Sequence, residues 1–169
     1  HAAWPLMREQ NYGRIVFTTS AAGIYGNFGQ TNYSAAKLAQ LGMAQTLATE
    51  GRKKNICVNT IAPIAGSRLT ETVMPKEVLD LLKPEFVTPL VVKLCDENSE
   101  VTNGLFEVGA GFLAEVRWER TQGAYLDTEA GFEAEDIDAS WAKITDFTDA
   151  AHPADIGEAN KAIFAGLKR

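Results

Sequence analysis

The chain has 169 residues, of which 46% are hydrophobic and 22% are charged, and these values predict a globular protein with one sizeable core. Its net charge of -6 argues against nucleic acid and anionic membrane as partners. No apolar run approaches the roughly 20 residues that a membrane-spanning helix needs. Cys57 and Cys95 are the only cysteines, and without a CxxC pair or a His/Cys cluster the sequence predicts no metal site.

The first expected element is the end of a helix. Residues 1–10 have the pattern of an amphipathic helix, and Asn11 and Gly13 are typical of its end. Because the chain starts with His1 inside this helical pattern, we expect it to be a piece of a longer polypeptide.

A strand, a loop and a long helix are expected next. The β-branched and aromatic run Arg14–Thr19 predicts a buried parallel strand, and a glycine-punctuated loop is expected from Gly23 to Gly29. Thr31 or Asn32 can cap the following helix, which is rich in alanine and runs to Gly51.

The middle of the chain alternates strands with helices. Ile56–Ile61 predicts a second buried strand, and Pro75 begins a short helix. Another helix is expected from Thr88 to about Glu97, before a third strand over Leu105–Val108. This alternation predicts parallel βαβ units and an open α/β sheet.

The composition of the sequence changes beyond about residue 126. Residues 127–139 carry several acidic side chains and no basic one, which is typical of a solvated linker. A helical extension is expected over 140–169. We therefore predict three parts: an α/β region over 1–126, an acidic linker over 127–139 and the helical extension.

Three side chains near the first predicted strand could carry chemistry. Ser20 follows the strand, at the sheet edge where ligands bind in open α/β proteins. Tyr33 and Lys37 are four residues apart in a predicted helix and so share one face. Most Tyr-x-x-x-Lys pairs are surface neighbours without function, but the strand-end serine and the glycine loop favour a site.

The chemistry open to this trio is proton transfer. A phenol, with an ordinary pKa of about 10, is a poor base at neutral pH, and a nearby ammonium favours the phenolate. Tyr33 could then take a proton from a substrate alcohol, while Ser20 holds the same oxygen. The accompanying hydride transfer needs a cofactor such as a nicotinamide, whose ribose Lys37 could bind.

Four motifs occurring in order carry a family resemblance. NFGQTNYSAAK, NTIAPIAGSRLTETVMP, GLFEVGAG and RWERTQGA resemble the short-chain dehydrogenase/reductase family. Within it they look most like the (3R)-hydroxyacyl-CoA dehydrogenase domains of fungal-type peroxisomal multifunctional enzymes of type 2. The resemblance covers about residues 1–126.

The resemblance assigns expected roles to individual residues. It implies that Ser20, Tyr33 and Lys37 are catalytic and that Tyr33 and Lys37 also bind the cofactor. It further implies cofactor contacts at Pro63, Ile64 and Thr70, with the nicotinamide carboxamide near Ile64 and the cofactor phosphates near Thr70.

The sequence lacks three features of the family pattern. It has no GxGxxG phosphate loop, and the family's ribose-reading acid and catalytic asparagine are expected upstream of residue 1. The resemblance therefore implies the C-terminal half of a Rossmann-like, doubly wound parallel sheet, with a helical C-terminal extension. We expect this half to be inactive alone. NAD is implied by the family only, and NADP stays open.

The resemblance implies a function and leaves two alternatives. The expected reaction is oxidation of a (3R)-3-hydroxyacyl-CoA to a 3-ketoacyl-CoA in peroxisomal fatty-acid β-oxidation, as part of a multifunctional enzyme. The expected partner is a second dehydrogenase domain, in a homodimer or pseudo-dimer. One alternative is another short-chain ketone reductase, such as a 3-ketoacyl-carrier-protein reductase. The other is a non-catalytic dimerisation or scaffold module.

Overall fold

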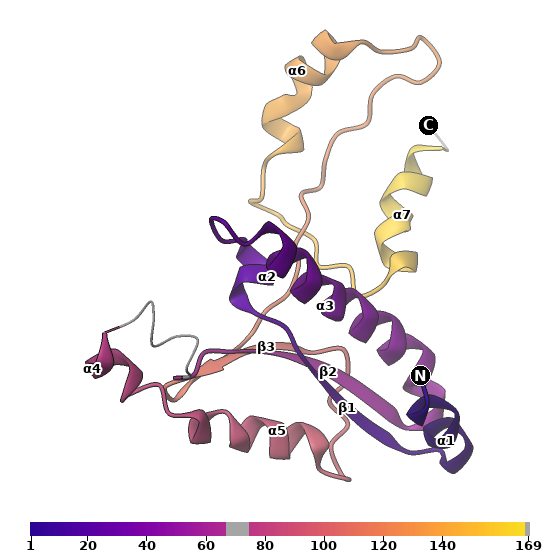
Figure 1. The fold of residues 1–169 in the computed structure, drawn as a ribbon. Helices are drawn as coiled ribbons and strands as arrows, with labels where there is room; N and C mark the ends of the chain where they lie inside the picture. Colours follow the sequence, from indigo (N-terminus) through magenta and orange to yellow (C-terminus); the bar gives the residue numbers. More distant parts are fainter. Residues whose placement is uncertain (67–74, 168–169) are drawn as a thin grey trace. The chain divides into compact units, whose positions relative to one another are not determined.

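The computed structural model describes residues 1–66 and 75–167, which form two compact units, His1–Val116 and Arg117–Arg169. The first unit contains a sheet with helices on both sides (Figure 1). In chain order its elements are α1 (Ala3–Gln10), β1 (Gly13–Thr18), α2 (Ala21–Tyr25), α3 (Thr31–Gly51), η1 (Arg52–Lys54), β2 (Ile56–Pro63), α4 (Lys76–Leu79), η3 (Pro84–Phe86), α5 (Thr88–Cys95), β3 (Leu105–Gly109) and β4 (Phe112–Glu115).

The sheet has the strand order β1-β2-β3-β4. The first three strands are parallel, with Thr18 opposite Ile61 and Pro63 opposite Val108. β4 pairs with β3 in the antiparallel direction. The open, mostly parallel α/β sheet predicted from the sequence is thus confirmed, and its carboxyl edge is formed by the ends of β1, β2 and β3.

Two apolar clusters attach helices to opposite faces of this sheet. On one face Ala44 and Ala48 of α3 pack on Ile56 and Val58 of β2. On the other face Leu90 and Leu94 of α5 pack on strand residues that include Val108. Figure 1 shows α3 and α5 on either side of the strands. Because alanine is small, the α3 backbone can approach the sheet closely.

The residues before α3 differ in two ways from the expectation. Gly23, expected in a loop, is buried within the short helix α2, which Ser20 caps. Thr31 and Asn32, expected as caps, lie inside α3, and Gln30 holds the cap position. The Asn32 side chain accepts a hydrogen bond from the Tyr33 N–H, so it satisfies a first-turn donor from within the helix.

The second unit is built from two helices, α6 (Ala134–Ile144) and α7 (Ile156–Gly166), and extended segments around them. An isolated bridge joins Arg120 to Ala151, and neither helix has a buried residue. The acidic segment 127–139, expected to be a linker, includes the first turn of α6 and its capping box of Glu133 and Asp136. Across the described ranges no helix has the length and apolarity to cross a bilayer.

Candidate active site

Ser20 stands where β1 ends and α2 begins. Its backbone is extended, and its Oγ accepts a hydrogen bond from the Ala22 N–H at 3.2 Å. The residue before it, Thr19, donates its N–H to the Ile61 carbonyl at 2.8 Å, so the backbone is still fixed to β2 at this point. A hydroxyl that accepts one bond keeps its own proton for donation. Ser20 can therefore donate to a ligand oxygen from a fixed position.

Tyr33 and Lys37 lie in the first two turns of α3. The Lys37 Nζ donates a hydrogen bond to the Thr18 carbonyl at 2.9 Å and lies 5.7 Å from the centroid of the Tyr33 ring. Tyr33 is 42% exposed, so a ligand can reach this residue. The structure thus brings the predicted pair together beside the end of β1, which leads directly into Ser20.

Two threonines that sequence reasoning missed fix this arrangement. Thr19 is 2% exposed, and its Oγ1 donates to the Lys37 carbonyl at 2.6 Å. Together with the bond from Lys37 to the Thr18 carbonyl, this makes two hydrogen bonds between the end of β1 and one residue of α3. Both threonines directly precede Ser20 in the sequence, but their contacts with Lys37 depend on how closely α3 approaches the end of β1.

Pro63 and Ile64 lie at the carboxyl end of β2, next to the end of β1. The Ile64 N–H donates to the Val108 carbonyl of β3 at 2.8 Å, while its side chain is 47% exposed. A Cβ at Gly109 would contact the Ile64 backbone oxygen at 2.5 Å, so only glycine fits there. The Ile64 segment is therefore held against β3. Thr70 lies outside the described residues.

The donor set at this edge is suited to an alcohol or ketone and to a sugar hydroxyl. Ser20 offers a hydroxyl, Tyr33 a phenol, and Lys37 an ammonium that has used one of its three hydrogens on Thr18. The remaining ammonium hydrogens fit the ribose of a dinucleotide. Hydroxyl, phenol and ammonium together can exchange a proton with a substrate oxygen and stabilise the charge that develops.

Neither Asn59 nor the cavity of the second unit contributes to this donor set. Asn59 is 1% exposed, donates to the Val101 carbonyl at 2.7 Å and accepts from the Gly104 N–H at 3.0 Å, so it holds a loop. A cavity of about 930 Å³ within the second unit is lined by residues between Arg120 and Leu167. Of the expected site residues that the structure describes, none lines this cavity.

Comparison with known proteins places this geometry in a family. Residues 1–78 match the family model described as short chain dehydrogenase. Over 169 residues the chain is 56% identical to the peroxisomal multifunctional enzyme type 2 of Mus musculus, an alignment that covers 99% of this chain and 23% of that protein. Residues 1–78, which carry the candidate site, belong to the short-chain dehydrogenase family.

Two further similarities extend over most of the chain. It is 51% identical over 153 residues to the peroxisomal hydratase-dehydrogenase-epimerase of Neurospora crassa, covering 90% of the chain and 17% of that protein. It is 38% identical to the full-length peroxisomal multifunctional enzyme type 2 of Drosophila melanogaster, with a TM-score of 0.89, covering 99% of the chain and 31% of that structure. The family resemblance read from the motifs is confirmed, and the chain spans less than a third of each of these proteins.

Proposed function

We propose that this chain supplies the catalytic residues of an NAD-dependent dehydrogenase that oxidises (3R)-3-hydroxyacyl-CoA to 3-ketoacyl-CoA in peroxisomal β-oxidation. The observation that carries the proposal is the Lys37 ammonium, held over the Tyr33 ring by its bond to the carbonyl of Thr18, two residues before Ser20. The family membership and the names of the relatives, which include peroxisomal and dehydrogenase, support the reaction class and the location.

The proposed mechanism assigns one task to each side chain. Ser20 donates a hydrogen bond to the substrate's 3-oxygen and orients it. Tyr33 takes the proton of the 3-hydroxyl as the C3–H bond breaks, and the Lys37 charge stabilises the negative charge on the phenol oxygen. A bound nicotinamide would accept the hydride from C3, so the alcohol loses a proton and a hydride and becomes a ketone.

Four residues would hold the nicotinamide end of the cofactor. Lys37 has ammonium hydrogens left for ribose hydroxyls, and Tyr33 lies beside it on α3. Pro63 and Ile64 line the neighbouring strand end, where the exposed Ile64 side chain offers an apolar surface for a ring. Thr70 is proposed to contact the cofactor phosphates, on the strength of the family resemblance.

A second dehydrogenase domain is the proposed partner, as a homodimer or pseudo-dimer through α3. The face of α3 turned away from the sheet carries exposed Leu38 and Met43, 41% and 50% accessible. Exposed apolar side chains among small residues suit close packing of one helix on another. Sedimentation analysis of the full-length protein tests the homodimer, and a monomer at micromolar concentration contradicts it unless the same polypeptide carries the second dehydrogenase domain of a pseudo-dimer.

The function is tested with the full-length polypeptide that contains this chain. Purified protein is mixed with NAD and a (3R)-3-hydroxyacyl-CoA, and the formation of NADH is followed by absorbance. Tyr33→Phe removes one hydroxyl and should lower kcat by roughly 10²–10⁴-fold, the usual contribution of acid–base catalysis. Tyr12→Phe, a change at the opposite end of β1, is the matched control. The (3S) substrate and NADP serve as specificity controls.

Three outcomes contradict parts of the proposal. Unchanged turnover in Tyr33→Phe rejects the assigned base. Preference for NADP, or for an acyl-carrier-protein substrate, favours the alternative ketone reductase. Absence of NADH formation by the intact polypeptide with either enantiomer favours a scaffold module.

A further inference from the structure

A hydrogen bond joins α2 to β3 beside the candidate site. The Tyr25 hydroxyl donates to Glu107 Oε2 at 3.1 Å, across 82 positions of sequence. Tyr25 is the last residue of α2, the helix that Ser20 caps. Within the described residues Glu107 accepts a side-chain hydrogen bond only from Tyr25, and no Lys or Arg forms an ion pair with it.

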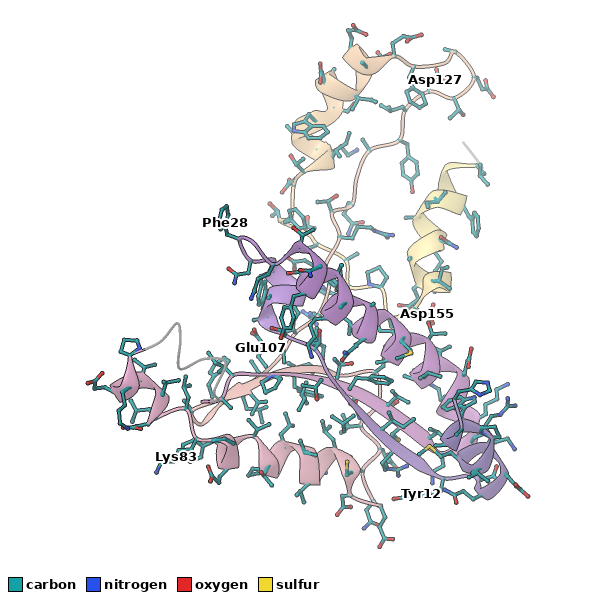
Figure 2. All side chains as sticks on the ribbon, viewed as in Figure 1. Tyr12, Phe28, Lys83, Glu107, Asp127 and Asp155 are labelled. Atoms are coloured by element: carbon teal, nitrogen blue, oxygen red, sulfur yellow. The ribbon has the colours of Figure 1, made fainter. Side chains whose placement is uncertain are left out.

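The position of Glu107 explains why the bond crosses the sheet edge. Glu107 pairs with Ala62 of β2, one residue before Pro63. Its neighbours Phe106 and Val108 pack on the α5 side. Since side chains alternate along a strand, Glu107 points to the face that α2 and α3 cover (Figure 2). The bond thus spans from the helix after β1 to the third strand, over the end of β2.

The short helix α2, which ends at Tyr25, has little intrinsic stability. It has five residues, which is too short for stability from helix propensity. Its N-terminal end is fixed by Ser20 and Thr19. Its other end passes into Gly26 and Gly29, which have φ of 78° and 74°, and into Phe28, whose side chain is fully exposed. Among the described residues, Glu107 provides the side-chain anchor for this second end.

We infer that Tyr25 and Glu107 are a positioning pair, which holds α2 and thereby the Ser20 hydroxyl in the orientation that the dehydrogenase reaction needs. The inference rests on the proposed function. Neither residue touches the reacting atoms, so both act through Ser20. A phenol is protonated at neutral pH, and desolvation and the Glu107 carboxylate raise the pKa of Tyr25 further above its ordinary value, so its hydroxyl keeps the proton that it donates.

The kinetic test uses variants of the full-length polypeptide. Tyr25→Phe and Glu107→Leu should each lower kcat by roughly tenfold, about the rate equivalent of one hydrogen bond, and leave KM for NAD unchanged. Glu107→Gln keeps an acceptor oxygen and should retain near-full activity. The double variant should be no slower than either single variant, because both remove the same bond. The pH at which kcat rises should not move, since Tyr33 and Lys37 are intact.

Amide hydrogen exchange on the same proteins gives a readout that does not depend on activity. Tyr25→Phe should speed exchange in the segment 21–30, while Tyr12→Phe, whose hydroxyl has no hydrogen bond in the described part of the chain, should not. Faster exchange with unchanged kcat overturns the positioning role, as do additive effects in the double variant. If Tyr33→Phe is active, the proposed function fails. The exchange measurement then decides whether the pair anchors α2, and unchanged exchange overturns the inference.

Discussion

The Lys37 Nζ lies 5.7 Å from the centroid of the Tyr33 ring because its hydrogen bond to the Thr18 carbonyl, 2.9 Å long, holds it there. A free lysine side chain samples many rotamers, and ordering it costs up to about 2 kcal/mol. Here the end of β1 provides the acceptor, so the sheet determines where the charge lies. The sequence spacing of four residues brings the two side chains to one helix face, and the strand carbonyl fixes their separation.

Replacement of Lys37 tests this relationship. Lys37→Met keeps most of the length and removes the charge, and we expect kcat to fall by about 10²-fold or more, as when a stabilising charge is lost. KM for NAD should also rise, because the ribose loses its donors. Steady-state kinetics measure both, with thermal unfolding as the control for folding. A variant that keeps full kcat contradicts the proposed role of the ammonium.

Asn59 should matter for stability and not for chemistry. Its buried amide satisfies the Val101 carbonyl and the Gly104 N–H, and Asn59→Leu leaves both without a partner. Each orphaned group costs about 1–3 kcal/mol, so we expect the free energy of local opening to fall by about 2–6 kcal/mol. Amide exchange over residues 99–104 measures this loss. Thr102→Val, which removes a single acceptor for the Val58 N–H, should cost less. Equal protection in Asn59→Leu and the parent contradicts the prediction.

The sequence was sufficient to predict the elements whose signals are local. β1 and β2 are rich in β-branched residues, with β1 beginning at Gly13 and β2 ending at Pro63. α3 is a long run made mostly of good helix formers. Ser20, Tyr33 and Lys37 could be assigned to one site because the sequence indicates where the strand ends and which residues share one face of the following helix. The contacts of Thr18 and Thr19 with Lys37 could not be predicted, because they depend on how closely α3 approaches β1.

Among the elements that were not predicted, α2 and β4 were missed for identifiable physical reasons. α2 looks like a loop because Gly23 suggests one, whereas in the structure glycine is needed there to let α2 approach Lys37. β4 was missed because its turn is unusual: Ala110 and Gly111 both have positive φ, 48° and 83°. Such hairpin turns normally use Asn or Asp with Gly, and alanine gives no such signal.

The loop at Asp127 in the second unit should loosen in acid. Asp127 Oδ1 accepts from the N–H groups of Ala130 and Glu129, and these two bonds lower the pKa of the carboxyl below its usual value. Because the pKa is lower in the folded chain than in the unfolded chain, the stabilisation is fully present above the pKa of the unfolded chain. It is lost as the pH falls through the pKa of the folded chain. Protection of the Glu129 and Ala130 amides from hydrogen exchange, measured by NMR, should therefore decrease as the pH falls from the ordinary Asp pKa through the lowered pKa of Asp127.

The matched control for this titration is Asp127→Asn. The amide keeps an Oδ1 acceptor, so the turn should persist at neutral pH, but it cannot titrate. Protection that falls equally in the variant and the parent would show that the carboxylate is not responsible.

Gly23 couples the packing of α2 to the position of the site. A Cβ at this position would lie 2.9 Å from Lys37 Cβ and 3.0 Å from the Leu38 backbone nitrogen, and backbone cannot move aside as a side chain end can. Alanine in a helix gains about 0.5–1 kcal/mol over glycine, but overpacking costs about 1–3 kcal/mol, so Gly23→Ala should be destabilising overall. Since the displaced residue is Lys37, kcat should fall as well. Melting temperature and kcat measured on the same preparation test both effects, and a Gly23→Ala protein that is more stable and fully active would contradict the close packing of α2 on α3.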